Sequence, residues 1–367
     1  MALEQFHILE EDAIRVKHEN LKQTVVNLFV RMNVPEDDAQ LGADCLVTAD
    51  LRGVDSHGVS NMLRYYINGY TTGTINPKPQ WRIVREAPAA ATIDCDKGLG
   101  IIIAPKAMDL ATKKAKETGV GAVAMANGRH LGMASYHAMR ALTHDMIGMC
   151  MTATGASVLP TFGREPRLGT NPVAYAVPAK EMAPFVMDWA TSVVAGNKLG
   201  IGRRLGATIP GNWIARKDGT IVTEPGPIPE RSMPPNAEFY ILPFGGTREM
   251  GSHKGYGLAA LVEILCGILS GGGFAMIRER GNARHFVSAY NVANFIPVDE
   301  FKQMMDDFLR SLASTPPAPG YDRVVYPGQL EAEEAAERQT KGIPLHKEVI
   351  QWLEDISKEL SLPFILV

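Results

Sequence analysis

The sequence predicts a mixed α/β fold, and three observations lead to this prediction. Apolar side chains recur at helical spacing over residues 1–70. Short apolar runs typical of buried strands alternate with helical patterns from residue 120 onward. The 35 glycines and 24 prolines imply many turns between these elements. With 367 residues, of which 46% are hydrophobic, the chain is long enough for two or three domains with a real core.

The first 70 residues predict three helices. The first carries an apolar stripe made by Leu21, Val25, Leu28, Phe29 and Met32. The second starts at Pro35, because the three acidic residues that follow suit the positive end of a helix dipole, and it ends near Arg52-Gly53. The third runs from about Gly58 to Asn68 and has Tyr66 among its apolar positions.

Strands and helices then alternate along the rest of the chain. The apolar runs predict strands at residues 81–84, 91–93, 120–126, 146–153, 173–177 and 185–188. The periodic stretches predict helices at residues 105–117, 134–144, 254–269, 301–312, 331–339 and 346–360. Residues 199–253 are rich in Gly and Pro, so they predict loops and short hairpins.

Charge and cysteine usage exclude several classes of protein. The net charge is −3 without any basic block, so nucleic acid and anionic membranes are not expected as partners. Four cysteines stand far apart, which argues against a metal site or a disulfide scaffold and predicts a reducing, cytoplasmic location: Cys45, Cys95, Cys150 and Cys266. The N-terminus has no signal-like segment. The apolar stretch after Gly255 is interrupted by Glu263, which favours a buried helix over a membrane span.

One glycine motif resembles a dinucleotide fingerprint but has the wrong context. Residues 119–124 match G-x-G-x-x-A, yet they follow a predicted helix and open a predicted strand. A Rossmann loop does the opposite, since it follows a strand and opens a helix. By contrast, the strand at 120–126, the glycine-bearing loop after it and the next helix form an arrangement typical of nucleotide sites.

The segment Asp50–Val59 concentrates reactive side chains between two helices. Asp55 or Ser56 is a good N-cap for the third helix, and His57 follows at once. Because imidazole titrates near neutrality, His57 is a candidate to take a hydroxyl proton while hydride leaves the same carbon. The alternative is that His57 is a surface residue beside a helix cap.

Other candidates have similar alternatives. His130 lies at a glycine-flanked strand-to-helix turn, where it is either a site residue or a helix cap. Asp188 ends an apolar strand, so it either receives ribose hydroxyls or caps the next helix. Lys198 and Lys254 stand beside glycines and either bind an anion or face solvent. The remaining candidates form a solvated helix face: Glu331, Glu333 and Glu334.

Taken together, five motifs identify a family. They occur in the order Asp55-Ser56-His57-Gly58-Val59, Arg129-His130-Leu131-Gly132, Leu168-Gly169-Thr170-Asn171-Pro172, Asp188-x-Ala190-Thr191-Ser192 and Lys254-Gly255-Tyr256-Gly257-Leu258. Over roughly residues 10–360 the chain resembles the second, non-Rossmann family of malate and L-lactate dehydrogenases. That family also includes sulfolactate and ureidoglycolate dehydrogenases and diketogulonate and cyclic-imine reductases.

The resemblance implies an architecture as well as a reaction. It implies an NAD(P)-binding domain on a mostly antiparallel mixed sheet, which we place at residues 76–299. It also implies a helical domain built from both chain ends, which we place at residues 1–75 plus 300–367. The expected partner is a second copy of the chain in a homodimer, and the expected cofactor is NAD or NADP.

The resemblance further assigns roles to residues. His57 would be the proton donor or acceptor, oriented by Ser56, with Lys198 as a polar relay, although His130 has the acid–base role in some members. Thr170 would touch substrate. Residues expected to line the cofactor are His130, Leu131, Gly132, Met133, Ala134, Asp188, Trp189, Ala190, His253, Lys254, Pro327 and Gly328.

This chain departs from the family pattern at three places. Asn61 stands where the family has an arginine that clamps the substrate carboxylate, and Arg64, one turn further, could replace it. Gly196-Asn197 replaces the usual Arg-Gly before the relay position, and both are expected near substrate. Gln329-Leu330 replaces Glu-Arg after Pro327-Gly328, which leaves the choice between NAD and NADP open.

The resulting hypothesis is a dehydrogenase that interconverts a 2-hydroxy acid and a 2-keto acid, of malate or L-lactate type. Within the same class the alternatives are a ureidoglycolate or sulfolactate dehydrogenase and a reductase of cyclic imines or 2-keto acids. From another class, the alternative is a dinucleotide-binding protein without catalytic activity.

Overall fold

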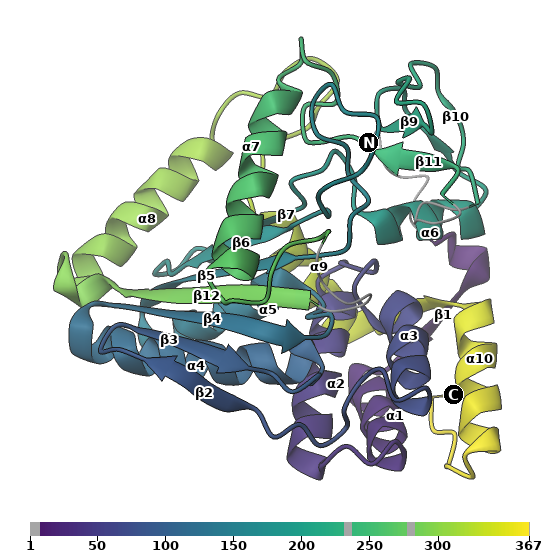
Figure 1. Ribbon diagram of the computed structural model, residues 1–367, viewed down its shortest axis with the longest axis horizontal. Helices are drawn as coiled ribbons and strands as arrows, with labels where there is room; N and C mark the ends of the chain where they lie inside the picture. The colour runs from purple at the N-terminus through teal and green to yellow at the C-terminus, as the bar shows by residue number, and fades with distance from the viewer. Residues whose placement is uncertain (1–7, 231–236, 277–282, 367) are drawn as a thin grey trace.

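A seven-stranded mixed sheet forms the centre of the molecule (Figure 1). The computed structural model describes residues 8–230, 237–276 and 283–366. In spatial order the strands are β2 (Arg82–Glu86), β3 (Ala90–Asp94), β4 (Val120–Gly128), β12 (Ala283–Asn291), β5 (Met146–Ala153), β6 (Val173–Val177) and β7 (Phe185–Trp189). Among the described strands of this sheet, β3 and β4 pair in parallel, while the other neighbouring pairs are antiparallel. The predicted mostly antiparallel mixed sheet is confirmed.

The G-x-G-x-x-A motif belongs to the packing of a helix on this sheet. Gly119 is the C-cap of α4 (Gly100–Thr118) and has a φ of 85°, a left-handed angle that glycine adopts freely. A Cβ on Gly121 would stand 1.9 Å from the carbonyl oxygen of Ala111 on α4. The two glycines therefore let the chain leave α4 and return beneath it as β4.

The sheet is covered on both faces. Helices α4 and α5 (Ala134–Met139) lie on one face, and α7 (Ser252–Val262) with its continuation η4 (Glu263–Ile268) lies on the other (Figure 1). Residues along β5 alternate between the two layers: Cys150 packs in the core under α4, whereas Met149 and Met151 pack with residues of α7 and η4.

Helices from both ends of the chain pack together beside the sheet. They are α1 (His18–Arg31), α2 (Glu36–Leu51), α3 (Val59–Thr71) and α10 (Lys347–Glu359). Strands β1 (Ala13–Val16) and β13 (Ile343–His346) pair antiparallel and join the two ends. The division into residues 1–75 plus 300–367 and residues 76–299 stays a prediction, and α8 (Val298–Ala313) lies apart from these helices at the opposite end of the sheet (Figure 1).

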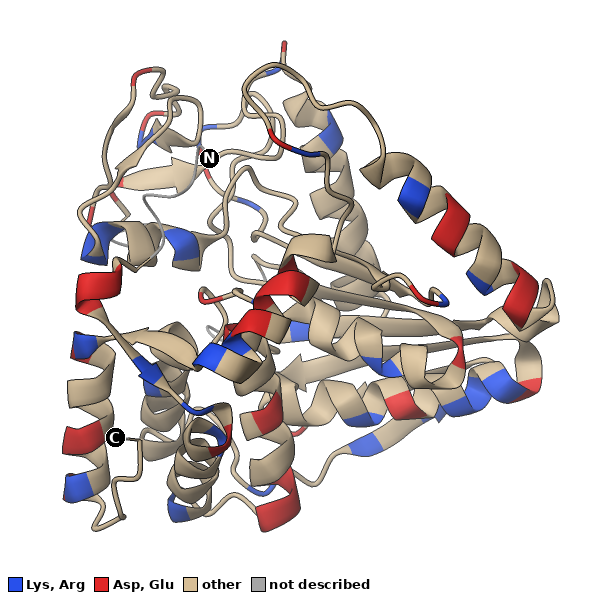
Figure 2. Cartoon of the chain, turned by 180° about the vertical axis from the view of Figure 1, so that it is seen from behind, with Lys and Arg blue, Asp and Glu red and all other residues tan. Residues whose placement is uncertain are grey.

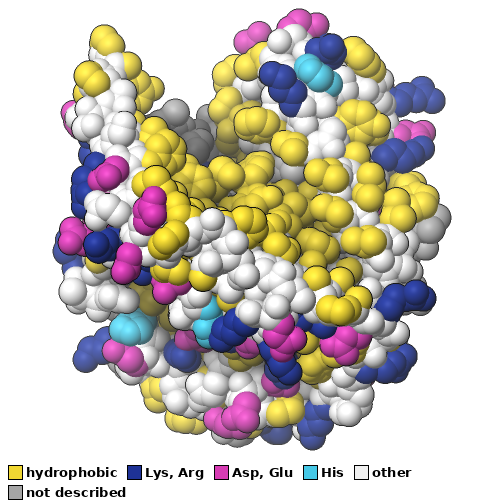
Figure 3. All heavy atoms as spheres, turned by 90° about the vertical axis from the view of Figure 1, so that its left-hand side faces the viewer, with side chains coloured by type: hydrophobic (Ala, Val, Ile, Leu, Met, Phe, Trp, Pro, Cys, Tyr) yellow, Lys and Arg dark blue, Asp and Glu magenta, His cyan; other side chains and the backbone are white. Residues whose placement is uncertain are grey.

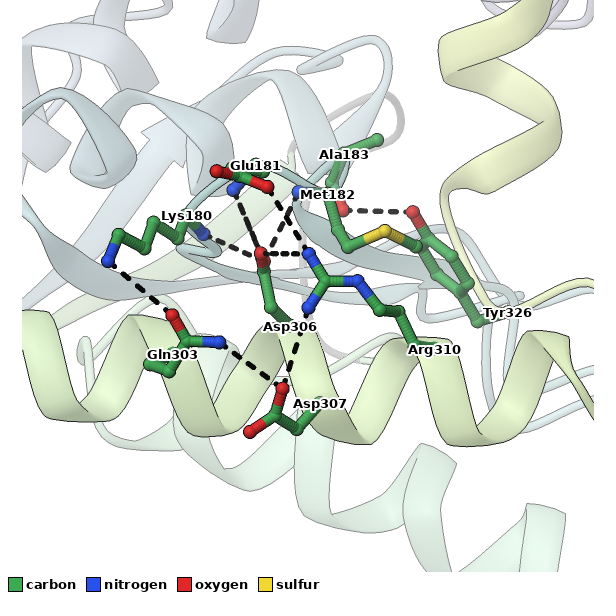
Figure 4. A network of polar contacts seen from close by, with 9 residues as sticks. All are labelled: Lys180, Glu181, Met182, Ala183, Gln303, Asp306, Asp307, Arg310 and Tyr326. Atoms are coloured by element: carbon green, nitrogen blue, oxygen red, sulfur yellow. Dashed lines mark hydrogen bonds and ion pairs between the residues drawn. The ribbon is translucent and has the colours of Figure 1, made fainter.

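A buried carboxylate of α8 contacts the β6–β7 turn (Figure 4). Asp306, which is 0% exposed, accepts hydrogen bonds from the backbone amides of Lys180, Glu181 and Met182 and pairs with Arg310. Tyr326 donates its hydroxyl to the carbonyl of Ala183 in the same turn. Thus α8, the β6–β7 turn and the segment before α9 (Gln329–Lys341) are held as one unit.

Four of the described elements were not expected from the sequence: β1, β13, β12 and α6 (Gly196–Arg204). The helical interpretation of residues 1–70 is wrong at residues 13–16, because β1 forms there by pairing with the distant β13. The central strand β12 lies between β4 and β5, and its Arg284 and His285 are 0% exposed. These polar side chains interrupt the apolar run by which a buried strand is recognised in a sequence. Helix α6 falls partly in the stretch 199–253, where a loop prediction is wrong for residues 199–204; its three glycines weaken the helical signal.

The remainder of that stretch forms short hairpins around a small core of its own. Its strands are β8 (Thr208–Ile209), β9 (Ile214–Arg216), β10 (Gly226–Pro227) and β11 (Phe239–Ile241), and residues 231–236 lie outside the described residues. Val158, Phe239 and Ile241 are buried in this core. Single 3₁₀ turns complete the elements: η2 (Glu10–Asp12), η3 (Arg140–His144) and η5 (Val292–Asn294).

The apolar helix predicted at residues 254–269 exists, but the prediction that it is buried is wrong for one of its faces. Val262 and Cys266 pack on the sheet. The outer face leaves five large side chains exposed: Leu258, Leu261, Ile264, Ile268 and Leu269. When a helix is apolar on all sides, the sheet of a single chain can bury only one of its faces. In the described part of the chain, no helix combines the length and apolar character of a membrane span.

Candidate active site

The turn that carries His57 is fixed by a buried carboxylate from the preceding helix. The backbone amide of Val59 donates to Asp50 Oδ2 at 2.8 Å, at the start of α3. A Cβ on Gly58 would stand 1.8 Å from Asp50 Oδ1, so only glycine allows this approach. The prediction that Asp55 or Ser56 caps α3 is therefore wrong, because Gly58 is the N-cap and Asp50 supplies the side-chain acceptor.

Ser56 contacts the imidazole of His57, whereas Asp55 serves another partner. Ser56 Oγ lies 2.9 Å from His57 Nδ1. Asp55 instead accepts from Arg338 Nη1 at 2.7 Å, and the same guanidinium also donates to Glu334. Burial lowers the pKa of His57 to about 4, so the ring is neutral at physiological pH. A neutral imidazole oriented by a hydroxyl is ready to accept a proton.

His130 stacks on His57. The ring centroids are 5.7 Å apart and the ring planes differ by 12°. Tyr66 Oη lies 2.8 Å from His130 Nδ1, and the amide of Gly132 donates to the same nitrogen at 3.1 Å. Burial, and after it the neighbouring His57, lowers the pKa of His130 to about 3. The structure therefore brings both candidate histidines into one site and leaves both uncharged.

Helix α6 lies against the turn of His57. Asn197 donates to the carbonyl oxygen of Ser56 at 3.0 Å, and Asn61 donates to the carbonyl oxygen of Asp55 at 2.7 Å. Both asparagines thus hold the backbone of the turn. Lys198 follows Asn197 and is half-buried, and this burial lowers the pKa of its ammonium. Gly196 begins the helix.

Arg64 is directed toward α10. Its Nη2 lies 2.7 Å from Glu348 Oε1, and its guanidinium lies 4.8 Å from the centre of the Trp352 ring. Arg204 of α6 lies near the other oxygen of Glu348, at 3.8 Å. In this arrangement Arg64 has a carboxylate partner within its own chain.

Thr170 lies in the loop that precedes β6. Its carbonyl oxygen accepts from both the amide and the hydroxyl of Thr191, just beyond β7. The next residue, Asn171, is fully buried and donates to Glu263 Oε2 at 3.0 Å on the opposite layer. Glu263 in turn pairs with the buried Arg284. The half-buried Thr170 is therefore placed by partners on both sides.

Asp188 caps a helix, though not the next helix in the chain. Its Oδ2 accepts from the amide of Ser135 at 2.7 Å, in the first turn of α5. Asp188 is exposed to solvent, yet nearby protein atoms desolvate its carboxylate. Desolvation raises the pKa of Asp188, and the charge of Glu331 adds to the increase. Two residues earlier on β7, the amide of Val186 donates to the carbonyl oxygen of Pro327, beside Gly328.

Arg52 supplies a donor that is suitable for a cofactor. Its Nε is buried and has no hydrogen-bond partner among the described residues. The charges that act on it are those of Glu331 and Asp188. A buried donor without a partner is costly, and a ribose or phosphate oxygen would satisfy it. The residues around Asp188 therefore fit a polar group such as a dinucleotide.

The remaining cofactor candidates divide into two places. Residues 131–134 are buried and connect His130 to α5, and Trp189 and Ala190 are half-buried beside Asp188. By contrast, His253 and Lys254 lie exposed in the first turn of α7, where His253 Nδ1 is 2.9 Å from Arg248. Residues 131–134, Trp189 and Ala190 are therefore connected to the two histidines through α5 and Asp188. His253 and Lys254 lie on a different element, α7.

The acidic face of α9, prominent in Figure 2, is more than a solvated surface. Glu333 pairs with Arg323, and Glu334 pairs with Arg338, which is only 3% exposed. Glu331 contributes its charge to Arg52 and Asp188. Across the described ranges, no three His, Cys, Asp or Glu side chains gather in a way that would hold a metal ion.

Four site residues were not assigned by sequence reasoning: Asp50, Arg52, Tyr66 and Arg338. Asp50 and Tyr66 occupy inward positions of α2 and α3, and Arg338 lies on a helix that reads as solvated. The first of these carried a signal, because Asp50 continues the apolar stripe of Ala39, Ala43, Leu46 and Val47. A carboxylate on such a stripe needs a buried partner.

Comparisons with known proteins agree over nearly the whole chain. A family model described as malate/L-lactate dehydrogenase matches residues 16–354. The chain is 39% identical to the malate dehydrogenase of Pyrococcus horikoshii, over 96% of this chain and 98% of that protein. It is 38% identical to the L-sulfolactate dehydrogenase of Methanocaldococcus jannaschii, over 95% and 97%.

Solved structures agree as well. The structure of the Pyrococcus horikoshii malate dehydrogenase matches with a TM-score of 0.87 at 37% identity, covering 98% of this chain and 99% of that chain. The malate dehydrogenase of Entamoeba histolytica matches with a TM-score of 0.90 at 32% identity, covering 96% and 99%. The chain belongs to the malate/L-lactate dehydrogenase family.

Proposed function

We propose that this protein is an NAD(P)-dependent malate dehydrogenase, an oxidoreductase that interconverts a 2-hydroxy acid and its 2-keto acid. The observation that carries the proposal is the pair of His57, oriented by Ser56, and His130 stacked on it. Family membership supports the reaction class, and a relative named malate dehydrogenase at 39% identity supports malate as the substrate.

In this mechanism His57 moves the proton. A bound nicotinamide dinucleotide supplies the acceptor for the hydride that leaves C2 of the hydroxy acid. His57, whose pKa lies at about 4, takes the proton of the substrate hydroxyl as the carbonyl forms. The imidazolium then returns that proton to solvent. In the reverse direction protonated His57 donates to the carbonyl oxygen, and a bound substrate carboxylate beside it would raise its pKa.

Lys198 is the better candidate to hold the substrate carboxylate. It follows Asn197, which touches the turn of His57, and it is half-buried. Arg64 already pairs with Glu348 and covers Trp352, so binding substrate would break these contacts. Thr170 and Gly196 complete the proposed substrate contacts.

The proposed cofactor contacts surround Asp188. The loop of residues 130–134, Trp189, Ala190 and the Pro327-Gly328 turn lie close to its strand or to the helix that it caps. Arg52 offers the buried donor described above. His253 and Lys254 would contribute only if the cofactor reached the start of α7.

Initial rates test the proposal directly. Oxaloacetate, pyruvate, sulfopyruvate and a cyclic imine would be reduced with NADH and with NADPH, and malate and ureidoglycolate would be oxidised with NAD and with NADP. The highest kcat/KM with oxaloacetate and malate is expected. A preference for another substrate would assign the chain to a sister activity. If fluorescence showed binding of NADH or NADPH but no substrate were turned over, the protein would be a dinucleotide-binding protein without catalytic activity.

We further propose that the protein is a homodimer. Exposed apolar side chains lie on α7 and η4, as described above, and Met304 and Phe308 of α8 are exposed as well. Figure 3 shows a hollow lined by hydrophobic side chains on one side of the molecule. Such a continuous apolar surface marks an interaction site, and the family resemblance favours a second copy of the chain. Sedimentation of Leu261→Glu should give monomers, whereas Leu330→Glu, an exposed leucine on α9, should leave the dimer intact.

A reducing, cytoplasmic location is proposed on the basis of the thiols. Cys45, Cys95, Cys150 and Cys266 are all buried and free. Persistent free thiols are typical of reducing compartments. Cell fractionation should recover the protein with the cytosol, and recovery from an oxidising compartment would contradict the proposal.

A further inference from the structure

Two hydrogen bonds converge on one ring nitrogen of His130. The backbone amide of Gly132 donates to Nδ1 at 3.1 Å, and Tyr66 Oη lies 2.8 Å from the same atom. A backbone amide can only donate, so Nδ1 must offer its lone pair. The neutral ring then carries its hydrogen on Nε2.

The hydroxyl of Tyr66 acts in the same direction. Tyr66 is 0% exposed, and its burial raises the pKa of the phenol well above its usual value. The hydroxyl therefore keeps its hydrogen and donates it to Nδ1. Gly132 has a φ of 70°, which glycine adopts freely, and a Cβ there would stand 2.8 Å from Ile101. Both donors are thus held in place by the buried core.

The other ring nitrogen is available to a ligand. Within the described ranges, Nε2 of His130 has no hydrogen-bond partner, and the ring is stacked on the base His57. Tyr65 and Tyr66 face the ring from α3, and the side chains of His137 and His285 contribute to its surroundings. These tyrosines and histidines provide no carboxylate counter-ion that would favour an imidazolium at this position.

We propose that His130 is a permanent hydrogen-bond donor to the reacting oxygen of the substrate, through Nε2–H, and that Tyr66 is the positioning residue that keeps it in this form. The proposal rests on the proposed function, because a 2-keto acid presents that oxygen. His57 alone transfers a proton. His130 retains its own hydrogen throughout and polarises the carbonyl, as a neutral imidazole can.

The tautomer is tested without any assay of activity. Full-length protein labelled with ¹⁵N at histidine would be compared with His130→Gln to assign the ring resonances. We expect His130 to show a bare Nδ1 and a protonated Nε2 at every pH from 5 to 9. A hydrogen on Nδ1, or titration near pH 6.5, would overturn the proposal even if the chain turned out to have another substrate.

A matched pair of variants isolates the tyrosine. Tyr66→Phe removes the hydroxyl that contacts Nδ1, and Tyr70→Phe removes a buried hydroxyl without a described partner one turn later on α3. We expect a mixture of tautomers in Tyr66→Phe and the wild-type spectrum in Tyr70→Phe. With substrate, kcat should fall about three- to tenfold in Tyr66→Phe while the KM for cofactor stays unchanged. Equal spectra in the two variants would contradict the role of Tyr66.

Glutamine substitutions separate donation from proton transfer. A glutamine amide can replace an Nε2–H donor, but it cannot exchange a proton as imidazole does. His130→Gln should therefore keep much more activity than His130→Ala, and His57→Gln should lose nearly all activity. If His130→Gln were as inactive as His57→Gln, His130 would be a proton-transfer group and the proposal would be wrong.

Discussion

His57 and His130 stack with their ring centroids 5.7 Å apart, although one follows helix α2 and the other follows strand β4. Two adjacent imidazoles cannot both be charged without repulsion. Each has a different partner at Nδ1, since His57 contacts the hydroxyl of Ser56 and His130 contacts Tyr66 and Gly132. In the proposed mechanism, this difference allows one ring to exchange protons while the other stays neutral.

Replacement of His57 should remove catalysis and spare binding. We expect His57→Ala to lower kcat by about 10²–10⁴, the usual contribution of one acid–base group. The dissociation constant of NADH or NADPH, measured by fluorescence titration, should change little, because the proposed cofactor residues surround Asp188. His144→Ala, at an exposed histidine, is the control. Wild-type turnover by His57→Ala would refute the assigned base.

Stability should decline as the solution becomes acidic, before the carboxylates titrate. His57 and His130 have pKa values lowered by burial to about 4 and about 3, against about 6.5 in an unfolded chain. Between these limits the unfolded state binds more protons than the native state. The free energy of unfolding should therefore be fully present above pH 6.5 and fall progressively from there toward pH 4.

Urea denaturation at pH 8, 6 and 5 measures this effect. His130→Gln, which cannot be protonated, should show a shallower decline than wild type over the same range. A stability that stayed constant between pH 7 and pH 5 would mean that the histidines are protonated in the native state.

The sequence predicts the fold best where periodicity is uninterrupted. Residues 146–153 were expected as a strand and form β5 with the same limits. The central strand β12 escapes notice because Arg284 and His285 are buried in it, with His285 bonded to Thr152 and Arg284 paired with Glu263. Partners that lie far away in the sequence decide such positions, and no local pattern contains them.

The same limit applies to the site. The pairing of Ser56 with His57 follows from adjacency, and the motifs pointed to His130. Tyr66 has the spacing of a core residue, and only the folded chain places its hydroxyl 2.8 Å from His130. The ion pair of Asp55 with Arg338 likewise joins two segments that are far apart in the sequence, so no local sequence pattern predicts it.

Asp50 and Gly58 should show strong energetic coupling. Asp50→Ala removes the acceptor at the start of α3 and should cost about 0.5–2 kcal/mol of unfolding free energy, whereas Asp50→Asn keeps an oxygen and should cost less. Gly58→Ala should destabilise wild type, because the added methyl group meets the Asp50 carboxylate. In the Asp50→Ala background that clash is absent, so the same substitution should cost much less.

A double-mutant cycle from urea denaturation measures the coupling. Gly200→Ala serves as the control, because Gly200 is a helical glycine with open space around it. Gly73 also has open space, but its positive φ would add backbone strain to an alanine. Additive effects of the Asp50 and Gly58 substitutions would show that the carboxylate does not occupy the space assigned to it.

Asp306 should make the protein sensitive to acid at the α8 anchor. Although burial raises the pKa of Asp306, three backbone amides and Arg310 outweigh it and hold the pKa below its usual value. Its contribution to stability is therefore present above about pH 3.9 and is lost as the pH falls through the lower native value. Asp306→Ala should destabilise the protein by about 1–3 kcal/mol at pH 7, and Asp307→Ala, at its exposed neighbour, should not. Thermal unfolding of both variants and of wild type, compared at pH 7, measures the difference in stability.

Lys198 and Arg64 make opposite predictions about substrate binding. If Lys198 holds the substrate carboxylate, Lys198→Met should raise the KM for the keto acid by about 10- to 100-fold, the usual effect of losing a charged hydrogen bond. Arg64→Gln should leave that KM nearly unchanged, because its guanidinium is engaged by Glu348 at 2.7 Å and its loss removes only an exposed ion pair. Initial rates against keto acid concentration, with cofactor saturating, give both values. The reverse result, a high KM in Arg64→Gln with a normal one in Lys198→Met, would mean that Arg64 leaves Glu348 when substrate binds.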